Sequence, residues 1–211
     1  MPGDTLVLVH GLWMTGMESG LLRSRLRDEF GFAPEQYSYP SLQLGLDDNM
    51  RRLRDFMAGL PGERLHVVGH SLGGVLALRT LLRYPEPRPG RIVCLGSPLR
   101  GSAAARALAG LPFGTEALGA TLREAVLEDA LSAWEGPREV GVIAGTLGLG
   151  LGAVIGELPE PNDGTVAVEE TRLPGIKDHL EVDVSHMGLL GSPLVASQTA
   201  FFLRHGEFAR S

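Results

Sequence analysis

The sequence predicts an α/β fold in which a mostly parallel sheet of about six strands carries helices on both faces. Short apolar runs rich in β-branched residues alternate along the chain with longer stretches of helical period. The runs at 5–9 and 64–69 are almost continuously apolar, which is typical of strands in the middle of a parallel sheet. With 211 residues, 44% of them hydrophobic, and no abrupt change in composition, residues 1–211 are expected to form a single domain.

The alternation of short apolar runs with helical stretches indicates where the strands lie. In chain order they are expected at 5–9 (TLVLV), 36–39 (QYSY), 64–69 (RLHVVG), 91–96 (RIVCLG), 139–145 (EVGVIAG) and 179–185 (HLEVDVS). In the last strand Leu180, Val182 and Val184 face one way and polar residues face the other, which suits an edge of the sheet with one wet face. Helices are expected at 17–30, 46–59, 73–83, 102–109, 116–133 and 193–204.

Composition and charge exclude several classes of function. A net charge of -6 disfavours nucleic acid as a partner, because phosphate binding needs clustered Lys and Arg. The N-terminus lacks the basic and apolar segments of a secretory signal, and the glycine-rich run at 145–156 is shorter than the ~20 residues of a membrane span. A cytoplasmic location without a membrane span is therefore expected. The single cysteine, Cys94, lies in an apolar strand and is interpreted as a packed thiol.

A serine lies between two glycines where the third strand gives way to a helix, in the sequence GHSLGG at 69–74. The Gly-x-Ser-x-Gly pattern is weak alone, because the chain contains 29 glycines. Its strand-turn-helix context is the one that a nucleophile elbow requires, since glycines on either side let the two backbones pass without a clash. Ser71 is therefore predicted to present its hydroxyl above the sheet, rather than to join two elements in an ordinary turn.

A serine nucleophile needs a histidine base, and the chain has six histidines. His186 follows the last strand, at the sheet edge where Ser71 emerges, whereas His179 begins that strand, ~23 Å away. His186 is therefore the predicted base, with a loop histidine that caps the next helix as the alternative. His70 adjoins Ser71, but neighbouring side chains diverge at such a turn. His10 follows the first strand and is expected to shape the site.

The acid that orients the base should also follow a strand. Asp163 lies in the connection after the fifth strand, and Gly164 behind it permits a sharp turn that aims the carboxylate inward. The alternative is an ordinary surface turn. Glu169 and Glu170 are possible substitutes, and Asp183 is disfavoured because it lies on the strand before the histidine.

Two backbone amides are predicted to form an oxyanion hole, each lowering the barrier by about 3 kcal/mol. One is the N–H of Leu72, the residue after the serine. The other is the N–H of Leu12, because Gly11 before it allows a close approach to the site. A simple exit from the first strand is the alternative for this loop.

Five motifs follow one another along the chain in this order: VHGLW, GHSLGG, GSPLRGS, NDGTV and SHMGLL. With them the chain resembles the α/β-hydrolase superfamily and, within it, the small bacterial lipases and esterases. The resemblance implies Ser71 as nucleophile, Asp163 as acid, His186 as base, and Leu12 and Leu72 as oxyanion donors. It also implies that the first strand lies between the second and third, that the later strands follow outward, and that the family's first hairpin is missing.

The resemblance bears on metals and on a cap. Some relatives bind calcium through aspartates near the histidine, but Met187-Gly188-Leu189-Leu190 follows it here, so no metal and no other cofactor are expected. Residues 98–136 contain two expected helices that either cover the sheet or form a small cap over an acyl pocket. The run at 145–156 either lines an apolar pocket or is a packed loop.

The predicted function is hydrolysis of a small-molecule acyl ester through an acyl-serine. An acyltransferase or a thioesterase would use the same acyl-serine, and the sequence does not separate these alternatives. A binding scaffold without catalysis is the third alternative, although such proteins usually lose a member of the triad. The physiological substrate, the acyl chain length and the oligomeric state stay open.

Overall fold

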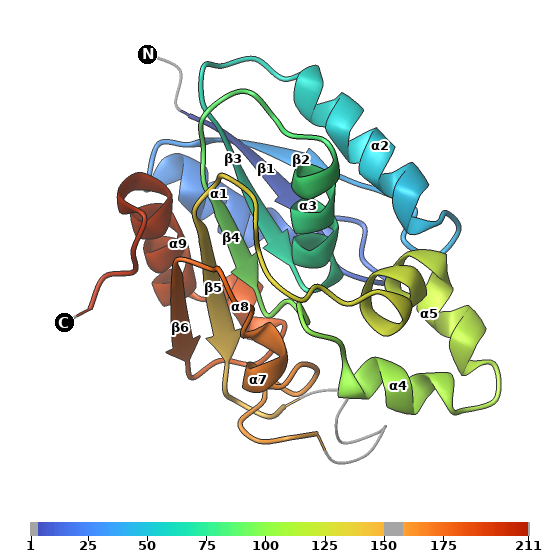
Figure 1. The fold of residues 1–211 in the computed structure, drawn as a ribbon. Coiled ribbons are helices and arrows are strands. Elements are labelled where there is room, and N and C mark those ends of the chain that lie inside the picture. The colour runs from blue at the N-terminus through green and yellow to red at the C-terminus, as the bar shows by residue number, and fades with distance from the viewer. Residues whose placement is uncertain (1–3, 150–157, 211) are drawn as a thin grey trace.

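The computed structural model describes residues 4–149 and 158–210, and in it six parallel strands form one sheet (Figure 1). The strands are β1 (Thr5–Val9), β2 (Ala33–Tyr37), β3 (Leu65–His70), β4 (Ile92–Leu95), β5 (Val140–Gly145) and β6 (Asp178–Val182). Their order is β2-β1-β3-β4-β5-β6, and every neighbouring pair is parallel. This confirms the α/β class and the expected place of the first strand between the second and the third.

Helices cover both faces of the sheet, as expected. The longer ones are α1 (Gly20–Asp28), α2 (Leu46–Ala58), α3 (Leu72–Arg83), α5 (Gly114–Leu122) and α9 (Pro193–His205). The shorter ones are η1 (Met17–Ser19), α4 (Ala103–Ala109), the π-helix η2 (Arg123–Glu128), α7 (Val168–Thr171) and α8 (Gly188–Gly191). One core packs α2, α3, α5 and η2 on the sheet, and a second core packs α1, α8 and α9 on the other face.

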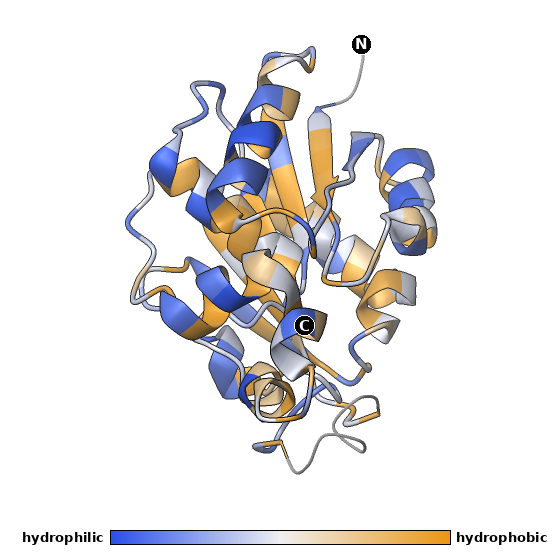
Figure 2. Cartoon of the chain, turned by 90° about the vertical axis from the view of Figure 1, so that its right-hand side faces the viewer, coloured by the Kyte–Doolittle hydropathy of each residue, from blue (hydrophilic) through white to orange (hydrophobic). Residues whose placement is uncertain are grey.

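The central strand shows why its sequence is apolar throughout. Val7 and Val9 of β1 belong to the first core, whereas Leu6 and Leu8 belong to the second. Because successive side chains of a strand point to opposite faces, a strand with a helix layer on each face needs apolar residues at every position. Figure 2 shows the result: the strands inside are hydrophobic, and the outer sides of the helices are hydrophilic.

Both edge strands differ from the expected bounds. β2 begins at Ala33 and ends at Tyr37 instead of covering 36–39. It contains Pro34, which an edge strand tolerates because it has hydrogen-bonded neighbours on one side. β6 is an edge strand as expected, but it ends at Val182, three residues before the predicted end.

The segment after β4 was expected to contain a helix over 116–133. In the structure α5 is interrupted at Gly119, which has a φ of 69°, and the π-helix that follows ends at Glu128. The long helix was therefore a wrong prediction, although Leu118, Leu122 and Val126, which recur near helical spacing in the sequence, are all buried. In 4–149 and 158–210, no helix is long and apolar enough to cross a bilayer.

Candidate active site

Ser71 lies at the apex of the turn between β3 and α3, as predicted from its flanking glycines. Its backbone adopts φ 54° and ψ -126°, an unusual conformation for a residue with a side chain, and its N–H donates to the Leu95 carbonyl at 2.8 Å. A Cβ at Gly69 would lie 2.4 Å from the Gly74 Cα, and one at Gly73 would lie 2.2 Å from the Val9 carbonyl oxygen. Glycine is therefore required on both sides of the serine.

Asp163 and His186 are hydrogen-bonded to each other in the buried interior. The distance from His186 Nδ1 to Asp163 Oδ2 is 2.7 Å, and the two residues are 8% and 1% exposed. The other carboxylate oxygen, Oδ1, accepts the N–H groups of Thr165 at 2.9 Å and Val166 at 2.8 Å. The His186 N–H also donates to the Asp163 carbonyl at 2.8 Å. This arrangement fixes the tautomer in which Nδ1 carries the proton and Nε2 is an acceptor.

Ser71 and His186 line the same cavity, which has a volume of about 250 Å³. Leu12, Trp13 and Met14 from the loop after β1 form one wall of it. The rest of the lining is mostly apolar, with His70, Ser102 and Thr165 as its further polar residues. The apolar residues are Pro98, Ala104, Ala105, Leu108, Leu118, Leu122, Leu149, Val166 and Met187. Within the described chain, no hydrogen bond joins the Ser71 hydroxyl to His186, a bond that often tightens only when substrate is present.

The two predicted amide donors lie beside Ser71. Leu72 is the first residue of α3, and Leu12 lies in the turn after β1. The loop is packed closely on the serine, because a Cβ at Gly11 would lie 3.0 Å from the Ser71 Cβ. In the part of the chain that the structure describes, neither the Leu12 N–H nor the Leu72 N–H has a protein acceptor.

His10 lies behind this loop and does not line the cavity. Its Nδ1 donates to the Gly11 carbonyl at 2.8 Å, and its Nε2 accepts the Tyr39 N–H at 3.1 Å. Its ring also stacks on Tyr39 at 4.4 Å. Burial lowers the pKa of His10, which suits a neutral ring that holds the loop in place.

His70 contacts the segment that carries His186, an arrangement that the sequence did not indicate. Its Nε2 lies 3.0 Å from the His186 carbonyl oxygen, and the two rings are 4.6 Å apart. Because a carbonyl can only accept, His70 must carry its proton on Nε2. Burial holds the pKa of His70 at about 3, so the ring is neutral at physiological pH. His70 therefore helps to hold the His186 loop above the sheet.

Acid should destabilise the protein through its buried histidines. The pKa of His70 is about 3 and that of His66 is about 4, both lowered by burial, whereas an unfolded histidine titrates near 6.5. Between these values the unfolded chain binds more protons, so the free energy of unfolding should fall as pH decreases from about 6.5. His70 alone contributes at most about 1.4 kcal/mol per pH unit. Urea unfolding at pH 7.5 and 5.0 should show a smaller loss in His70→Gln, and an equal loss would contradict this assignment.

The substitutes considered for the acid are engaged elsewhere. Glu170 accepts the N–H groups of Ala103 and Ala167, and Glu169 forms exposed ion pairs with Arg100 and Arg172. The other excluded side chains, those of His179 and Cys94, do not line the cavity of Ser71. His179 contacts the Thr171 hydroxyl at 2.8 Å, and Cys94 is buried with its pKa raised by desolvation to about 12.

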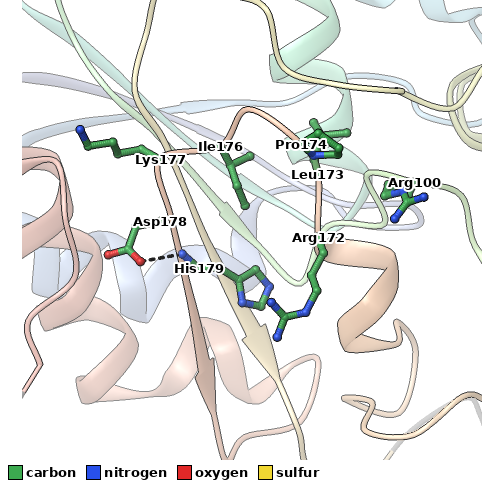
Figure 3. Close-up of a pocket in the computed structure, with 8 residues that line it drawn as sticks. All are labelled: Arg100, Arg172, Leu173, Pro174, Ile176, Lys177, Asp178 and His179. Atoms are coloured by element: carbon green, nitrogen blue, oxygen red, sulfur yellow. Dashed lines mark hydrogen bonds between the residues drawn. The ribbon is translucent and has the colours of Figure 1, made fainter.

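A second, more open hollow of about 510 Å³ lies away from Ser71, beside the start of β6 (Figure 3). It is larger, but its positive side chains are already paired. The pairs are Arg100 with Glu169 at 3.5 Å, Lys177 with Glu139 at 3.5 Å, and Arg172 with Glu181 at 2.5 Å. Residues 4–149 and 158–210 also contain no group of three or more His, Cys, Asp or Glu side chains that could hold a metal. The smaller cavity is therefore the candidate active site.

Comparisons with known proteins identify the family and the fold. A model of the alpha/beta hydrolase family matches residues 6–196. An uncharacterized protein of Mycobacterium tuberculosis (strain ATCC 25618 / H37Rv) is 29% identical in an alignment 171 residues long, which covers 75% of this chain and 49% of that protein. The chain thus spans about half the length of this curated relative.

Two solved structures share the fold. The mature lipase BlEst2 of Bacillus licheniformis superposes with a TM-score of 0.69 and 16% identity, over 96% of this chain and 91% of that one. The metagenomic carboxyl esterase MGS0156 superposes with a TM-score of 0.73 and 20% identity, over 97% of this chain and 76% of that one. At these identities the similarity concerns the fold.

Proposed function

Because the chain belongs to the alpha/beta hydrolase family, we propose that it hydrolyses carboxylic esters through an acyl-enzyme on Ser71. In the proposed reaction, His186 Nε2 takes the hydroxyl proton while Oγ attacks the ester carbonyl carbon. The resulting tetrahedral intermediate collapses as the imidazolium gives this proton to the leaving alcohol. Water, activated by the same imidazole, then attacks the acyl-serine and releases the carboxylic acid and the free serine.

The observation that carries this proposal is the buried hydrogen bond between Asp163 and His186, next to the cavity that Ser71 enters. A carboxylate at Nδ1 stabilises the imidazolium that forms during proton transfer and keeps Nε2 free to act as the base. The bond supports the roles of acid for Asp163 and base for His186. His10, Gly11 and His70 are proposed to shape the site without touching the reacting atoms.

The oxyanion of the intermediate is proposed to bind the N–H groups of Leu12 and Leu72. The absence of protein acceptors for these two donors in the described chain supports this role. Leu72 also begins α3, whose N-terminal end carries a positive partial charge. Together, two donors and a helix N-terminus would stabilise negative charge next to Ser71 Oγ.

The segment 98–136 is proposed to act as a cap over the substrate. It supplies seven residues to the cavity wall: Pro98, Ser102, Ala104, Ala105, Leu108, Leu118 and Leu122. All of them except Ser102 are apolar, so the cap favours a small-molecule ester with an apolar acyl or alcohol group.

A fluorophosphonate probe tests the proposed function directly. We expect one phosphonyl group on Ser71, located by mass spectrometry of peptides, and loss of p-nitrophenyl butyrate hydrolysis in proportion to labelling. Ser71→Ala should be neither labelled nor active. Absence of both labelling and hydrolysis in folded wild-type protein would refute the proposal and favour a binding scaffold. Hydrolysis that survives complete labelling would also refute it, because the reaction would then not pass through an acyl-enzyme on Ser71.

A further inference from the structure

Trp13 has a backbone conformation that is rare for a bulky residue. Its φ is 58°, in the left-handed region, and it directly follows Leu12, the proposed oxyanion donor. Such conformations persist when surrounding contacts hold them and are concentrated at functional sites. A contact that holds the backbone of Trp13 in this conformation therefore also affects the orientation of the Leu12 N–H.

That contact joins the loop after β1 to the segment that covers the cavity. The indole Nε1–H of Trp13 donates to the carbonyl oxygen of Ala117 in α5 at 2.9 Å, across 104 residues of sequence. Two residues later α5 is broken at Gly119, where an added Cβ would lie 2.6 Å from the Leu42 Cα. The hydrogen bond thus lies next to the break in α5, and at this break Gly119 packs closely against the backbone of Leu42.

Trp13 also faces the substrate side. It lines the cavity with Leu118 and Leu122 of the same helix segment, and 49% of its surface stays exposed. One side chain therefore contacts α5 and the cavity, while its own backbone adjoins Leu12. This side chain is therefore a direct contact between α5 and the loop.

We propose that Trp13 is a positioning residue that couples α5 to the oxyanion donor Leu12. A substrate packed against α5 would then stabilise the loop conformation in which the Leu12 N–H points at the reacting carbonyl. Without the indole bond, the left-handed φ of Trp13 can relax, which turns the adjoining Leu12 away from Ser71. This inference rests on the proposed hydrolase function. It adds that α5, in the segment proposed as a cap, positions a donor that stabilises the transition state.

Trp13→Phe tests the coupling, because it keeps an apolar ring in the cavity and removes the N–H. We expect kcat per titrated active site to fall about tenfold with KM within twofold. This loss is smaller than the about 10²- to 10³-fold cost of removing an oxyanion donor outright. The rate of fluorophosphonate labelling should fall by a similar factor, since the probe also places an oxygen in the hole. The pH profile should stay unchanged, because His186 and Asp163 are untouched.

Trp134→Phe is the matched control. The indole of Trp134 also donates to a backbone carbonyl, that of Arg138 at 2.8 Å, but Trp134 is buried and does not line the cavity. This variant should lose thermal stability and keep kcat per titrated site. A kcat for Trp13→Phe within twofold of wild type, with hydrolysis still dependent on Ser71, would overturn the coupling and leave the proposed function standing. Hydrolysis that does not depend on Ser71 would overturn both.

Discussion

Asp163→Asn should lower kcat for ester hydrolysis by about 10³- to 10⁴-fold and leave KM nearly unchanged. Oδ1 of Asp163 accepts two backbone N–H groups, from Thr165 and Val166, so the carbonyl oxygen of the new amide should take that position. Its NH₂ group then faces His186 Nδ1, where two donors cannot pair. His186 must therefore place its proton on Nε2, and that nitrogen can no longer accept the proton of Ser71.

Asp178→Asn provides a matched control for this substitution. Asp178 also accepts two backbone N–H groups, from His179 and Phe208 at 2.8 Å each, but it lies at the start of β6, away from the cavity. Steady-state kinetics should show kcat within twofold of wild type for this control. If Asp163→Asn kept a tenth of the wild-type kcat, the proposed role of the carboxylate would be wrong.

The position of the site could be predicted from the direction of the strands. Ser71, Asp163 and His186 each come after a strand, respectively β3, β5 and β6, and parallel strands end at one edge of the sheet. This rule excluded His179, which the structure places beside Thr171 instead. The buried hydrogen bond between Asp163 and His186 agrees with that reasoning. The rule could be applied to the sequence because it needs only the positions of the strands and no detail of the side chains.

Contacts between distant segments could not be predicted in the same way. His70 meets the His186 carbonyl across 116 residues, and Trp13 meets Ala117 across 104. Neither pair belongs to a local pattern, since each depends on how a loop and a helix pack in three dimensions. The break of α5 at Gly119 could not be predicted either. The helical period of the sequence does not indicate that the Leu42 backbone passes close to Gly119.

The predicted bounds of the edge strands were wrong for a related reason. A central strand is buried on both faces, so its composition marks its ends, as for β1 at Thr5–Val9. An edge strand is defined mainly by its pairing with one neighbour. In β2 the register with β1 includes Pro34, a residue that lies outside the strand expected at 36–39. Most of the glycine-rich run at 145–156 lies outside the described residues, so the prediction made for it stays a prediction.

Gly73→Ala should destabilise the fold by about 3 kcal/mol, the upper end of the usual cost of overpacking a core. The added Cβ would lie 2.2 Å from the Val9 carbonyl oxygen and 2.5 Å from that of His10. Both are backbone atoms at the end of the central strand, so neither can move aside as a flexible side chain would. Urea unfolding and thermal melting measure the change, with a melting temperature about 6–12 °C lower.

Gly20→Ala is the control with the opposite sign. Gly20 begins α1 with φ near -54°, and an added Cβ would meet nothing within 4 Å, so alanine should be neutral or stabilise the protein by up to about 1 kcal/mol. Any folded Gly73→Ala protein should also label slowly with a fluorophosphonate, because relief of the clash moves α3 and Ser71 away from the loop that carries Leu12. Equal stability of the two variants would show that the turn tolerates a side chain. The strained conformation of Ser71 would then need another explanation than the close passage of β1 and α3.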